Sequence, residues 1–336
     1  MLAEKFNVAG RTVERGGKPF VIAEAGANFN QSLDTAKRLI DVAAEAKADA
    51  VKFQLFKAEE LVSKEVQGFD ILKSVELNPE WVPALAEHAK SCSIPFMASA
   101  FSLDALAKLE AIGVPAHKVA SSEVLNLPLL AAMARTGKPI FLATGMSDLA
   151  DIALALDVIT SEGNDKVSLM HCYARYPLPE REANLRVIET LSRAFGGPVG
   201  FSDHTRTRKS SVAAVALGAV TFEKHYTLDK NSDGPDHFFA LEPKELIDYV
   251  SAIHETYAGL GDGIKTLHPE EMNGRRREAL HARRKISAGQ KLSNDDIEVR
   301  RPATGIRSRN HALVLGATAR NTIEAGDPIR WADIKF

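Results

Sequence analysis

The sequence has little of what a secreted, disulfide-stabilised or membrane-spanning protein requires. Cysteine occurs only twice, as Cys92 and Cys172, which is too few for a disulfide framework and suits a reducing compartment. No apolar run approaches the ~18 residues that a membrane span needs. The first residues also lack the basic-then-apolar pattern of a signal peptide. We therefore expect a cytoplasmic protein without disulfides and without a membrane partner.

Excess charge is missing as well. The 42 Lys and Arg residues nearly balance the 44 Asp and Glu residues, so the formal net charge is only −2. This balance argues against nucleic acid as the main partner, because binding to a phosphate backbone needs a basic surface. A local basic region can still hold an anionic small molecule. At 336 residues and 45% hydrophobic, the chain is long enough for one large core and a smaller module.

Eight short apolar runs alternate along the chain with eight segments of helical periodicity. Unbroken apolar runs are typical of parallel strands buried on both faces. Eight alternations predict an α/β fold of the (β/α)8 TIM-barrel type over residues 1–262, with an open doubly wound sheet as the alternative. The expected strands are 19–24, 50–54, 95–98, 116–120, 139–143, 167–171, 198–201 and 219–222, and the expected helices are 33–47, 79–91, 103–112, 128–135, 149–161, 185–195, 210–217 and 243–260.

Polar or ionisable residues stand at the carboxyl end of every expected strand, whereas Pro, Gly and Ala predominate at the amino ends. The carboxyl end of a TIM barrel carries the active site in characterised enzymes of this fold. We therefore expect one shared site built from these residues, which are Glu24, Lys52, Gln54, Ser99, Lys118, Ser121, Glu123, Thr144, His171, Cys172, Ser202–His204 and Glu223–His225.

The residue types in this set indicate two kinds of ligand. Lys52 and Lys118, together with several hydroxyls, suit a phosphate or carboxylate. His204 and His225 suit a divalent metal that acts as a Lewis acid on a carbonyl. Glu24 can orient a substrate hydroxyl or move a proton.

Simpler interpretations remain for each residue. The lysines can pair with Glu24 or Glu123 inside the barrel mouth, and each histidine can cap its strand by a hydrogen bond. Cys172 is more typical of a small buried hydrophobic residue than of a nucleophile.

From residue 263 the chain loses the strand–helix alternation and becomes highly charged, so we expect a linker over 263–280. Residues 281–336 contain an internal repeat. The segment Ile286–Leu292, which leads to Asp296-Ile297, is echoed by Ile323–Ile329, which leads to Asp333-Ile334. Two copies predict a small β-rich module with internal pseudo-symmetry. Its Arg-rich stretch 300–309 is either a solvated face or a segment that reaches a polar ligand.

Several motifs resemble those of one known family. In order along the chain they are IAEAGAN, VKFQ, HKVASSE, LATGM, HCYARYP, NLRVI, GFSDHT, VALGAVTFEKHYTLDK and GPDH. With their spacing, these motifs identify the chain as a member of the sialic acid (N-acetylneuraminate) synthase family, which includes legionaminic and pseudaminic acid synthases. The C-terminal module resembles the antifreeze-like (SAF, β-clip) domain that is appended to these enzymes.

The resemblance implies a transferase that condenses phosphoenolpyruvate with an N-acetylmannosamine-type sugar and water, giving a nine-carbon 2-keto acid and phosphate. It implies Mn²⁺ or Mg²⁺ held by His204 and His225, and a domain-swapped homodimer in which Arg301 reaches the sugar in the other subunit. The residues expected to hold phosphoenolpyruvate are Lys52, Ser99, Lys118, Ser121 and Ser202. Those expected to face the sugar or the reacting carbons are Glu24, Gln54, Tyr176 and Asp236, while Glu123 and Thr144 are further candidates for substrate binding.

The chain departs from the family pattern at three places. Ala143 stands where Ser or Thr is common, Tyr173-Ala174-Arg175 replaces smaller polar residues, and Phe238-Phe239 adds apolar bulk after GPDH. These changes leave the exact sugar open, with a legionaminic or another modified sugar as one alternative. A different metal-dependent barrel aldolase or keto acid synthase would lack the C-terminal repeat. A non-catalytic carbohydrate-binding barrel is the alternative from another functional class.

Overall fold

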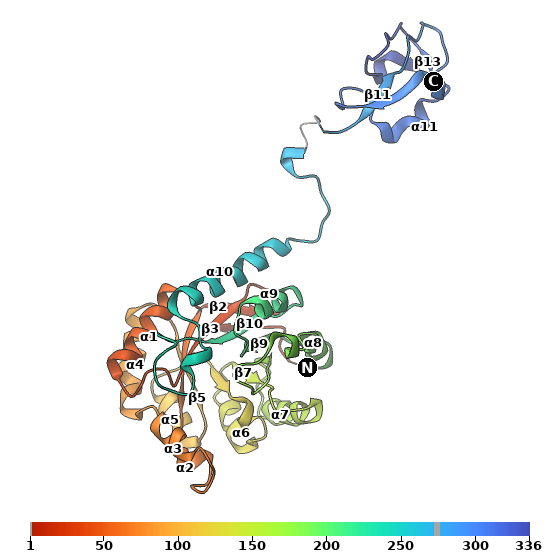
Figure 1. Ribbon diagram of the computed structural model, residues 1–336. Helices are drawn as coiled ribbons and strands as arrows, with labels where there is room; N and C mark the ends of the chain where they lie inside the picture. Colours follow the sequence, from red (N-terminus) through yellow and green to blue (C-terminus); the bar gives the residue numbers. More distant parts are fainter. Residues whose placement is uncertain (1, 272–275) are drawn as a thin grey trace. The chain divides into compact units, whose positions relative to one another are not determined.

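The computed structural model describes residues 2–271 and 276–336, and its ribbon is drawn in Figure 1. Contacts divide the chain into two units, residues 1–261 and 262–336. Each unit has its own hydrophobic core. None of the helices within the described ranges has the length and hydrophobicity that a membrane span needs. Cys92 and Cys172 are both free thiols.

The first unit is a closed barrel of eight parallel strands, which confirms the predicted TIM barrel and excludes the open sheet. The strands follow one another around the barrel in chain order, and β10 closes the ring against β3. Each consists almost entirely of buried residues, as expected for strands covered on both faces. Their bounds are β3 Phe20–Gly26, β4 Ala50–Leu55, β5 Phe96–Ala100, β6 His117–Val119, β7 Ile140–Ala143, β8 Val167–His171, β9 Val199–Asp203 and β10 Thr221–His225.

Helices surround the barrel and return the chain from the carboxyl end of one strand to the amino end of the next (Figure 1). The helix α1, for example, begins after Ser32, whose side chain accepts a hydrogen bond from the Thr35 amide, and buries Leu39 and Ile40 against the barrel. The bounds are α1 Leu33–Glu45, α2 Ala58–Leu61, α3 Phe69–Ser74, α4 Val82–Ser91, α5 Leu103–Ala111, α6 Leu127–Arg135, α7 Leu149–Ser161, α8 Val187–Phe195, α9 Lys209–Ala216 and α10 Pro243–Leu260. The short helices α2 and α3 lie between the expected strand 50–54 and the expected helix 79–91, where no element was predicted.

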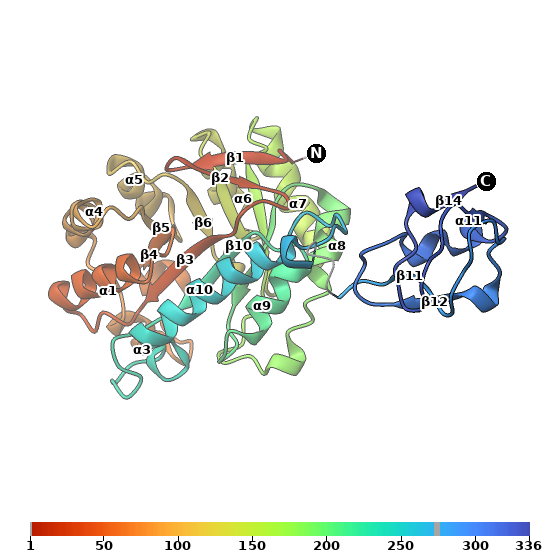
Figure 2. The ribbon, with the colours of Figure 1, turned by 90° about the horizontal axis from the view of Figure 1, so that it is seen from above.

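A hairpin of β1 (Lys5–Val8) and β2 (Arg11–Glu14) precedes the barrel and was not predicted. Its apolar residues Phe6, Val8 and Val13 join a separate core cluster formed by residues from the amino ends of the barrel strands. The Phe6 ring packs edge-on against Phe141, with ring centroids 6.2 Å apart. The hairpin, labelled in Figure 2, therefore closes the amino end of the barrel with apolar side chains.

The second unit is a small module of short antiparallel pairs, β11 (Ala279–Ala282) with β12 (Ile297–Arg300) and β13 (Thr318–Ala319) with β14 (Ile334–Lys335), plus the one-turn helix α11 (His311–Val314). Ile286 and Ile323, which begin the two sequence repeats, exchange both backbone hydrogen bonds at 2.9 Å. The predicted β-rich module with a repeated unit is therefore present. Residues 272–275 of the predicted linker lie outside the described residues, and the boundary at 281 stays a prediction.

Candidate active site

The register of the barrel strands brings the predicted polar residues together at one end. His225 pairs with Glu24 between β10 and β3, and Glu24 pairs with Lys52 between β3 and β4. Ser99 pairs with Lys118 between β5 and β6. Because side chains alternate along a strand, these positions point into the barrel while their neighbours face the helices. Residues from strands far apart in the sequence thus line the carboxyl end of the barrel, which we call the mouth.

Two lysines and two glutamates form a buried ionic network there. The Nζ atom of Lys52 lies 3.0 Å from Oε2 of Glu24 and 3.6 Å from Oε2 of Glu223. Oε1 of Glu223 lies 3.5 Å from Nζ of Lys118, so Glu223 stands between the two ammonium groups. All four side chains are at most 5% exposed. The ion pairs that the sequence analysis kept open as an alternative are therefore formed, with Glu223 rather than Glu123 as the second carboxylate.

Hydrogen bonds hold this network in place. Lys52 Nζ donates to Ser99 Oγ at 3.0 Å, and Gln54 Nε2 donates to Glu24 Oε1 at 2.7 Å. Ser202 Oγ approaches Glu223 Oε1 at 3.4 Å. The atoms Oε2 of Glu24 and of Glu223 are buried, and each faces the Lys52 ammonium in an ion pair without a well-aligned hydrogen bond. Buried carboxylate oxygens held in this way keep acceptor capacity for a ligand or a proton.

The protonation of the network follows from its burial and its neighbours. Burial raises the pKa of Glu24 to about 7, although Lys52 opposes the shift. Burial also opposes ionisation of Glu223, but the adjacent Lys118 and Lys52 outweigh it and lower its pKa. Near neutral pH, Glu223 is therefore ionised while Glu24 is divided between its two forms. The two lysine ammonium groups then carry more positive charge than the two carboxylates neutralise. This excess favours the binding of an anionic ligand.

Two histidines project into the same mouth from β9 and β10. The His204 and His225 rings have centroids 5.6 Å apart. Nδ1 of His204 lies 2.7 Å from the backbone oxygen of Tyr173, which can only accept, so Nδ1 carries a proton. Burial opposes ionisation of His204, but Cys172 and the Tyr173 backbone oxygen outweigh it and raise the pKa of this ring. Burial, followed by the neighbouring cations, lowers the pKa of His225 well below its usual value. His225 therefore offers a neutral nitrogen, whereas Nε2 of His204 becomes available when the second proton of that ring leaves.

The surroundings of His225 fit a divalent metal. Its Nδ1 atom is buried and has no hydrogen-bond partner. Oδ2 of Asp236 lies 3.6 Å from this nitrogen. Gly26, at φ +53°, leaves the adjacent space open, because a Cβ there would come within 2.8 Å of the Asp236 oxygen and 3.2 Å of the His225 nitrogen. An imidazole nitrogen without a hydrogen-bond partner and a nearby carboxylate, beside a glycine that adds no side chain, are donors that Mn²⁺ or Zn²⁺ accepts.

Other predicted residues lie around the mouth with different contacts. The Tyr176 ring packs 4.0 Å from the His204 ring, centroid to centroid. Ser121 Oγ accepts a hydrogen bond from the Gly145 amide, and Thr144 donates to the Met170 backbone oxygen, so both hydroxyls contact the β7 loop or β8. Glu123 accepts from Asn126 at 2.8 Å and does not join the lysine network. Arg301 belongs to the second unit and is exposed, and its role stays a prediction.

The departures from the family pattern occupy distinct positions. Phe239 is buried and packs against Tyr176 and His225, at centroid distances of 5.4 and 5.2 Å. Phe238 is 49% exposed. Arg175 forms an ion pair with Glu182 on the surface. Phe239 is therefore the departure that shapes the histidine side of the mouth.

Glu223 is the main residue to which sequence reasoning gave no role. It was noted at the end of the last strand, yet only His225 was selected from that segment as a ligand. The signal was present, because Glu223 and His225 are two residues apart and so face the same side of a strand. With contacts to both lysines, Glu223 is the centre of the ionic network.

A second network on the outer face of β9 and β10 supports the histidines from behind. Asp203, next to His204, accepts hydrogen bonds from the amide and hydroxyl of Thr205 and from Ser211 Oγ at 2.8 Å. Lys224, next to His225, lies 3.3 Å from the same carboxylate. Ser211 also bonds the Tyr249 hydroxyl at 2.7 Å. The network ties both histidine strands to the helices α9 and α10.

Comparison with known proteins identifies the family. The model of the NeuB family matches residues 39–265, and that of the SAF domain matches residues 277–335. The chain belongs to the NeuB family. A protein of Methanocaldococcus jannaschii named only as uncharacterised is 38% identical over 98% of this chain and 99% of its own.

Two further NeuB relatives carry functional names. The N,N'-diacetyllegionaminic acid synthase of Campylobacter jejuni is 38% identical over 93% of this chain and 99% of its own. Among solved structures, the N-acetylneuraminic acid synthetase of Leptospira borgpetersenii superposes with a TM-score of 0.76 at 33% identity, covering 81% of this chain and 95% of the other. The likeness thus includes proteins named as a legionaminic acid synthase and as a sialic acid synthetase.

Proposed function

We propose that this protein is a synthase that condenses phosphoenolpyruvate with an N-acetylated hexosamine and water to give a sialic-acid-like 2-keto acid and phosphate. The observation that carries the proposal is the convergence of Lys52, Lys118, Glu24 and Glu223 with His204 and His225 at one end of the barrel. The names of the NeuB relatives support the same reaction class.

In the proposed reaction the two lysines hold the anionic substrate. Burial lowers the pKa of Lys118, although the Glu223 carboxylate opposes the shift. An incoming phosphate or carboxylate would supply Lys118 with a second anion, and charge-assisted hydrogen bonds are stronger in a buried mouth than in water. Ser99 and Ser202, which already contact Lys52 and Glu223, complete the expected set of donors.

Glu24 is the proposed proton carrier. Its pKa of about 7 keeps a substantial protonated fraction at neutral pH, which is the property required of a general acid or base at that pH. When the enol carbon of phosphoenolpyruvate bonds to the sugar aldehyde, the aldehyde oxygen becomes a hydroxyl and needs one proton, which Glu24 can donate. Water then adds to the carbon that bears the phosphate and returns one proton to Glu24. The bond between that carbon and the phosphate oxygen breaks, which leaves the 2-keto group and inorganic phosphate. A divalent ion held by His204 and His225, Mn²⁺ in our proposal, would polarise that aldehyde as a Lewis acid.

The sugar is expected on the histidine side of the mouth, near Tyr176 and Asp236. Tyr176, which is 47% exposed and packs on the buried Phe239, presents an aromatic face there, and such a face favours the apolar side of a sugar or a methyl group. An N,N'-diacetylated 6-deoxy sugar carries more methyl groups than N-acetylmannosamine. We therefore propose the legionaminic series as the substrate class, in agreement with the name of the Campylobacter jejuni relative.

We further propose a domain-swapped homodimer in which the SAF unit covers the partner's mouth and Arg301 reaches the N-acyl group of the sugar. Tyr173, Tyr176 and Phe238 on the first unit are 37%, 47% and 49% exposed. Exposed aromatic residues around a candidate site suit a surface that another part of the assembly covers.

The test is phosphate release from phosphoenolpyruvate in the presence of Mn²⁺ across a panel of sugars. The panel contains N-acetylmannosamine, its 6-phosphate, and 2,4-diacetamido-6-deoxy hexoses of the legionaminic and pseudaminic configurations. We expect the highest kcat/KM with the legionaminic sugar. Release with another sugar would retain the reaction class and correct the substrate.

Absence of release with every sugar has two different meanings, which a binding measurement separates. If phosphoenolpyruvate still binds, the condensation with these sugars is refuted and the aldehyde partner is outside the panel. If phosphoenolpyruvate does not bind either, the non-catalytic carbohydrate-binding alternative replaces the proposal.

A further inference from the structure

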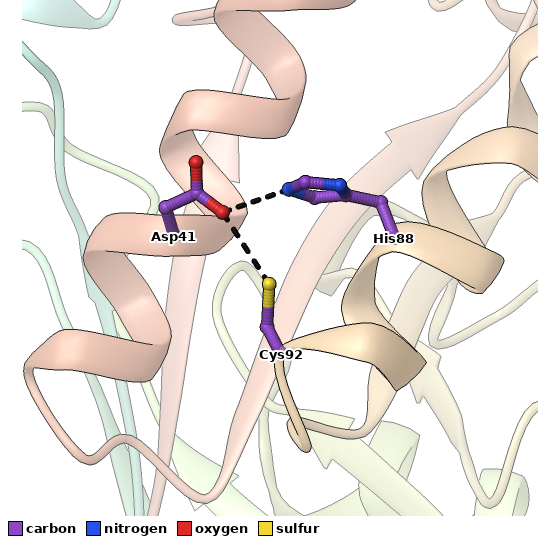
Figure 3. A group of neighbouring side chains, drawn as sticks. All are labelled: Asp41, His88 and Cys92. Atoms are coloured by element: carbon purple, nitrogen blue, oxygen red, sulfur yellow. Dashed lines mark hydrogen bonds and ion pairs between the residues drawn. The ribbon is translucent and has the colours of Figure 1, made fainter.

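A second group of metal-ligating side chains lies outside the barrel mouth. Figure 3 shows three such side chains converging between two helices. Asp41 lies on α1, His88 lies on α4, and Cys92 directly follows α4. Within the part of the chain that the structure describes, each of the three offers one ligand atom, and these atoms all lie within 4.8 Å of one another. The candidate active site does not use any of them.

The two helices determine how these side chains meet. His88 and Cys92 are four residues apart, and the Cys92 amide donates to the His88 backbone oxygen, so both side chains lie on the same face at the end of α4. Asp41 approaches from α1, which packs alongside α4. Its Oδ1 atom lies 2.7 Å from Nε2 of His88 and 3.3 Å from Sγ of Cys92.

These separations are close to those of a tetrahedral zinc site. Bond lengths of about 2.0 Å to nitrogen and oxygen and about 2.3 Å to sulfur place neighbouring ligand atoms about 3.3 to 3.7 Å apart. The sulfur–oxygen distance already fits, and the nitrogen–oxygen pair needs to open by well under 1 Å. The His88 and Asp41 side chains are 27% and 45% exposed, so side-chain rotation and a water at the fourth position are both possible.

We propose that Asp41, His88 and Cys92 form a zinc site that clamps α1 to α4. Thiolate, imidazole and carboxylate together select Zn²⁺ over Mg²⁺ or Mn²⁺, which prefer oxygen ligands. Binding replaces the thiol proton of Cys92, so one Zn²⁺ enters and one proton leaves to solvent. Because this proton must leave before the sulfur can bind, the zinc affinity increases with pH.

The proposed site serves stability rather than catalysis. Helices of a TIM barrel run opposite to the strands, so the end of α4 lies at the amino end of the barrel, away from the candidate active site. Ser93, just after α4, and Ala9, in the turn of the β1–β2 hairpin, line one surface hollow. The end of α4 therefore lies near the hairpin that closes the amino end of the barrel. A metal here would join residues about 50 positions apart in the chain and restrict the unfolded state.

The test titrates the chelator-treated full chain with Co²⁺, which replaces Zn²⁺ and reports a bound thiolate through a sulfur-to-cobalt charge-transfer band. We expect this band in the wild-type chain and its loss in Cys92→Ser. Cys172→Ser is the matched control, because Cys172 is the other thiol of the chain and lies 3.8 Å from His204. The band should persist in that variant.

A second measurement, of the melting temperature, does not depend on the cobalt absorption band. In the double variant His204→Ala/His225→Ala, which disables the candidate metal ligands of the mouth, Zn²⁺ should raise the melting temperature and Mn²⁺ should not. Adding His88→Ala should lower the Zn²⁺ affinity by about 100-fold or more. The proposal is overturned if the wild-type chain gives no charge-transfer band, if the band survives in Cys92→Ser, or if His88→Ala leaves the Zn²⁺ affinity unchanged.

Discussion

The two ends of the barrel are built from the same eight strands but have opposite chemistry. At the carboxyl end, Lys52, Lys118, Glu24 and Glu223 are buried in contact with one another. At the amino end, the β1–β2 hairpin closes the barrel with Phe6, Val8 and Val13. Buried charges cost stability unless they are fully paired, whereas buried apolar surface contributes to it.

This contrast separates the end that supplies stability from the end that supplies function. At the carboxyl end, one carboxylate oxygen of Glu24 and one of Glu223 are buried without a well-aligned hydrogen bond and are held by the Lys52 ammonium. A fold selected for stability alone would place apolar residues there, as it does at the amino end. Variants at the carboxyl end should therefore reduce activity more than stability, and variants at the amino end should do the reverse.

Glu223→Gln should have the strongest consequence of the variants considered. This change removes the negative charge between Lys52 and Lys118 while keeping the size of the side chain. We expect kcat/KM to fall about 1,000-fold, which is the scale of losing one preorganised charge in a buried site. Steady-state phosphate release measures it. Glu87→Gln, on the exposed side of α4, is the matched control and should retain full activity.

At the opposite end, Phe6→Ala should destabilise the fold without changing the chemistry. The side chain is 6% exposed and packs on Phe141, and truncating a buried phenylalanine costs about 3 to 5 kcal/mol. Denaturant unfolding measures the loss, while kcat at low temperature should equal that of the wild-type chain. A variant with lower kcat and unchanged stability would contradict the division between the two ends.

Glu24→Gln should change the pH dependence of stability. The pKa of Glu24 is about 7 in the folded chain against an ordinary value of 4.5, so the folded state binds more protons between these values. The stability contribution of this group is present at low pH and is lost as pH rises from about 4.5 to about 7. Relative to the wild type, Glu24→Gln should gain up to about 3 kcal/mol over that interval. If the free energies of unfolding of the wild type and the variant changed in parallel across this pH range, the raised pKa of Glu24 would be contradicted.

Behind the histidines, Tyr249→Phe should have the mildest consequence. The hydroxyl bonds Ser211, which in turn bonds Asp203 beside His204. Losing one such hydrogen bond costs about 1 kcal/mol. If this loss weakens the positioning of His204 in the transition state by the same amount, phosphate release should slow about fivefold. The matched control is Tyr257→Phe on the same helix. Equal rates in both variants would show that the outer network does not position the mouth.

The barrel and most of the mouth could be predicted because both follow from local patterns. Short apolar runs mark the strands, and the residue that follows each run marks the carboxyl end. The β1–β2 hairpin was missed although Phe6, Val8 and Val13 alternate with polar residues around Ala9-Gly10. A period of two was present there, but the segment is short and polar, and no strand was predicted before residue 19.

The remaining features depend on packing between distant segments. The hydrogen bond that Ser211 donates to Asp203 exists only because α9 covers the outer face of β9, and the ion pair of Asp203 with Lys224 follows from the register of β9 and β10. Asp41 and Cys92 meet across 51 positions. No local period encodes such contacts, and the raised pKa of Glu24 likewise results from burial that no single strand reveals.

The sharpest test of the active-site assignment is His225→Ala, assayed for phosphate release from phosphoenolpyruvate with the best sugar of the panel and added Mn²⁺. We predict that turnover is abolished while the circular dichroism spectrum and the melting temperature stay close to those of the wild-type chain, because the imidazole Nδ1 makes no hydrogen bond that the fold would lose. Unaltered turnover in this variant would contradict the assignment of the barrel mouth as the catalytic site.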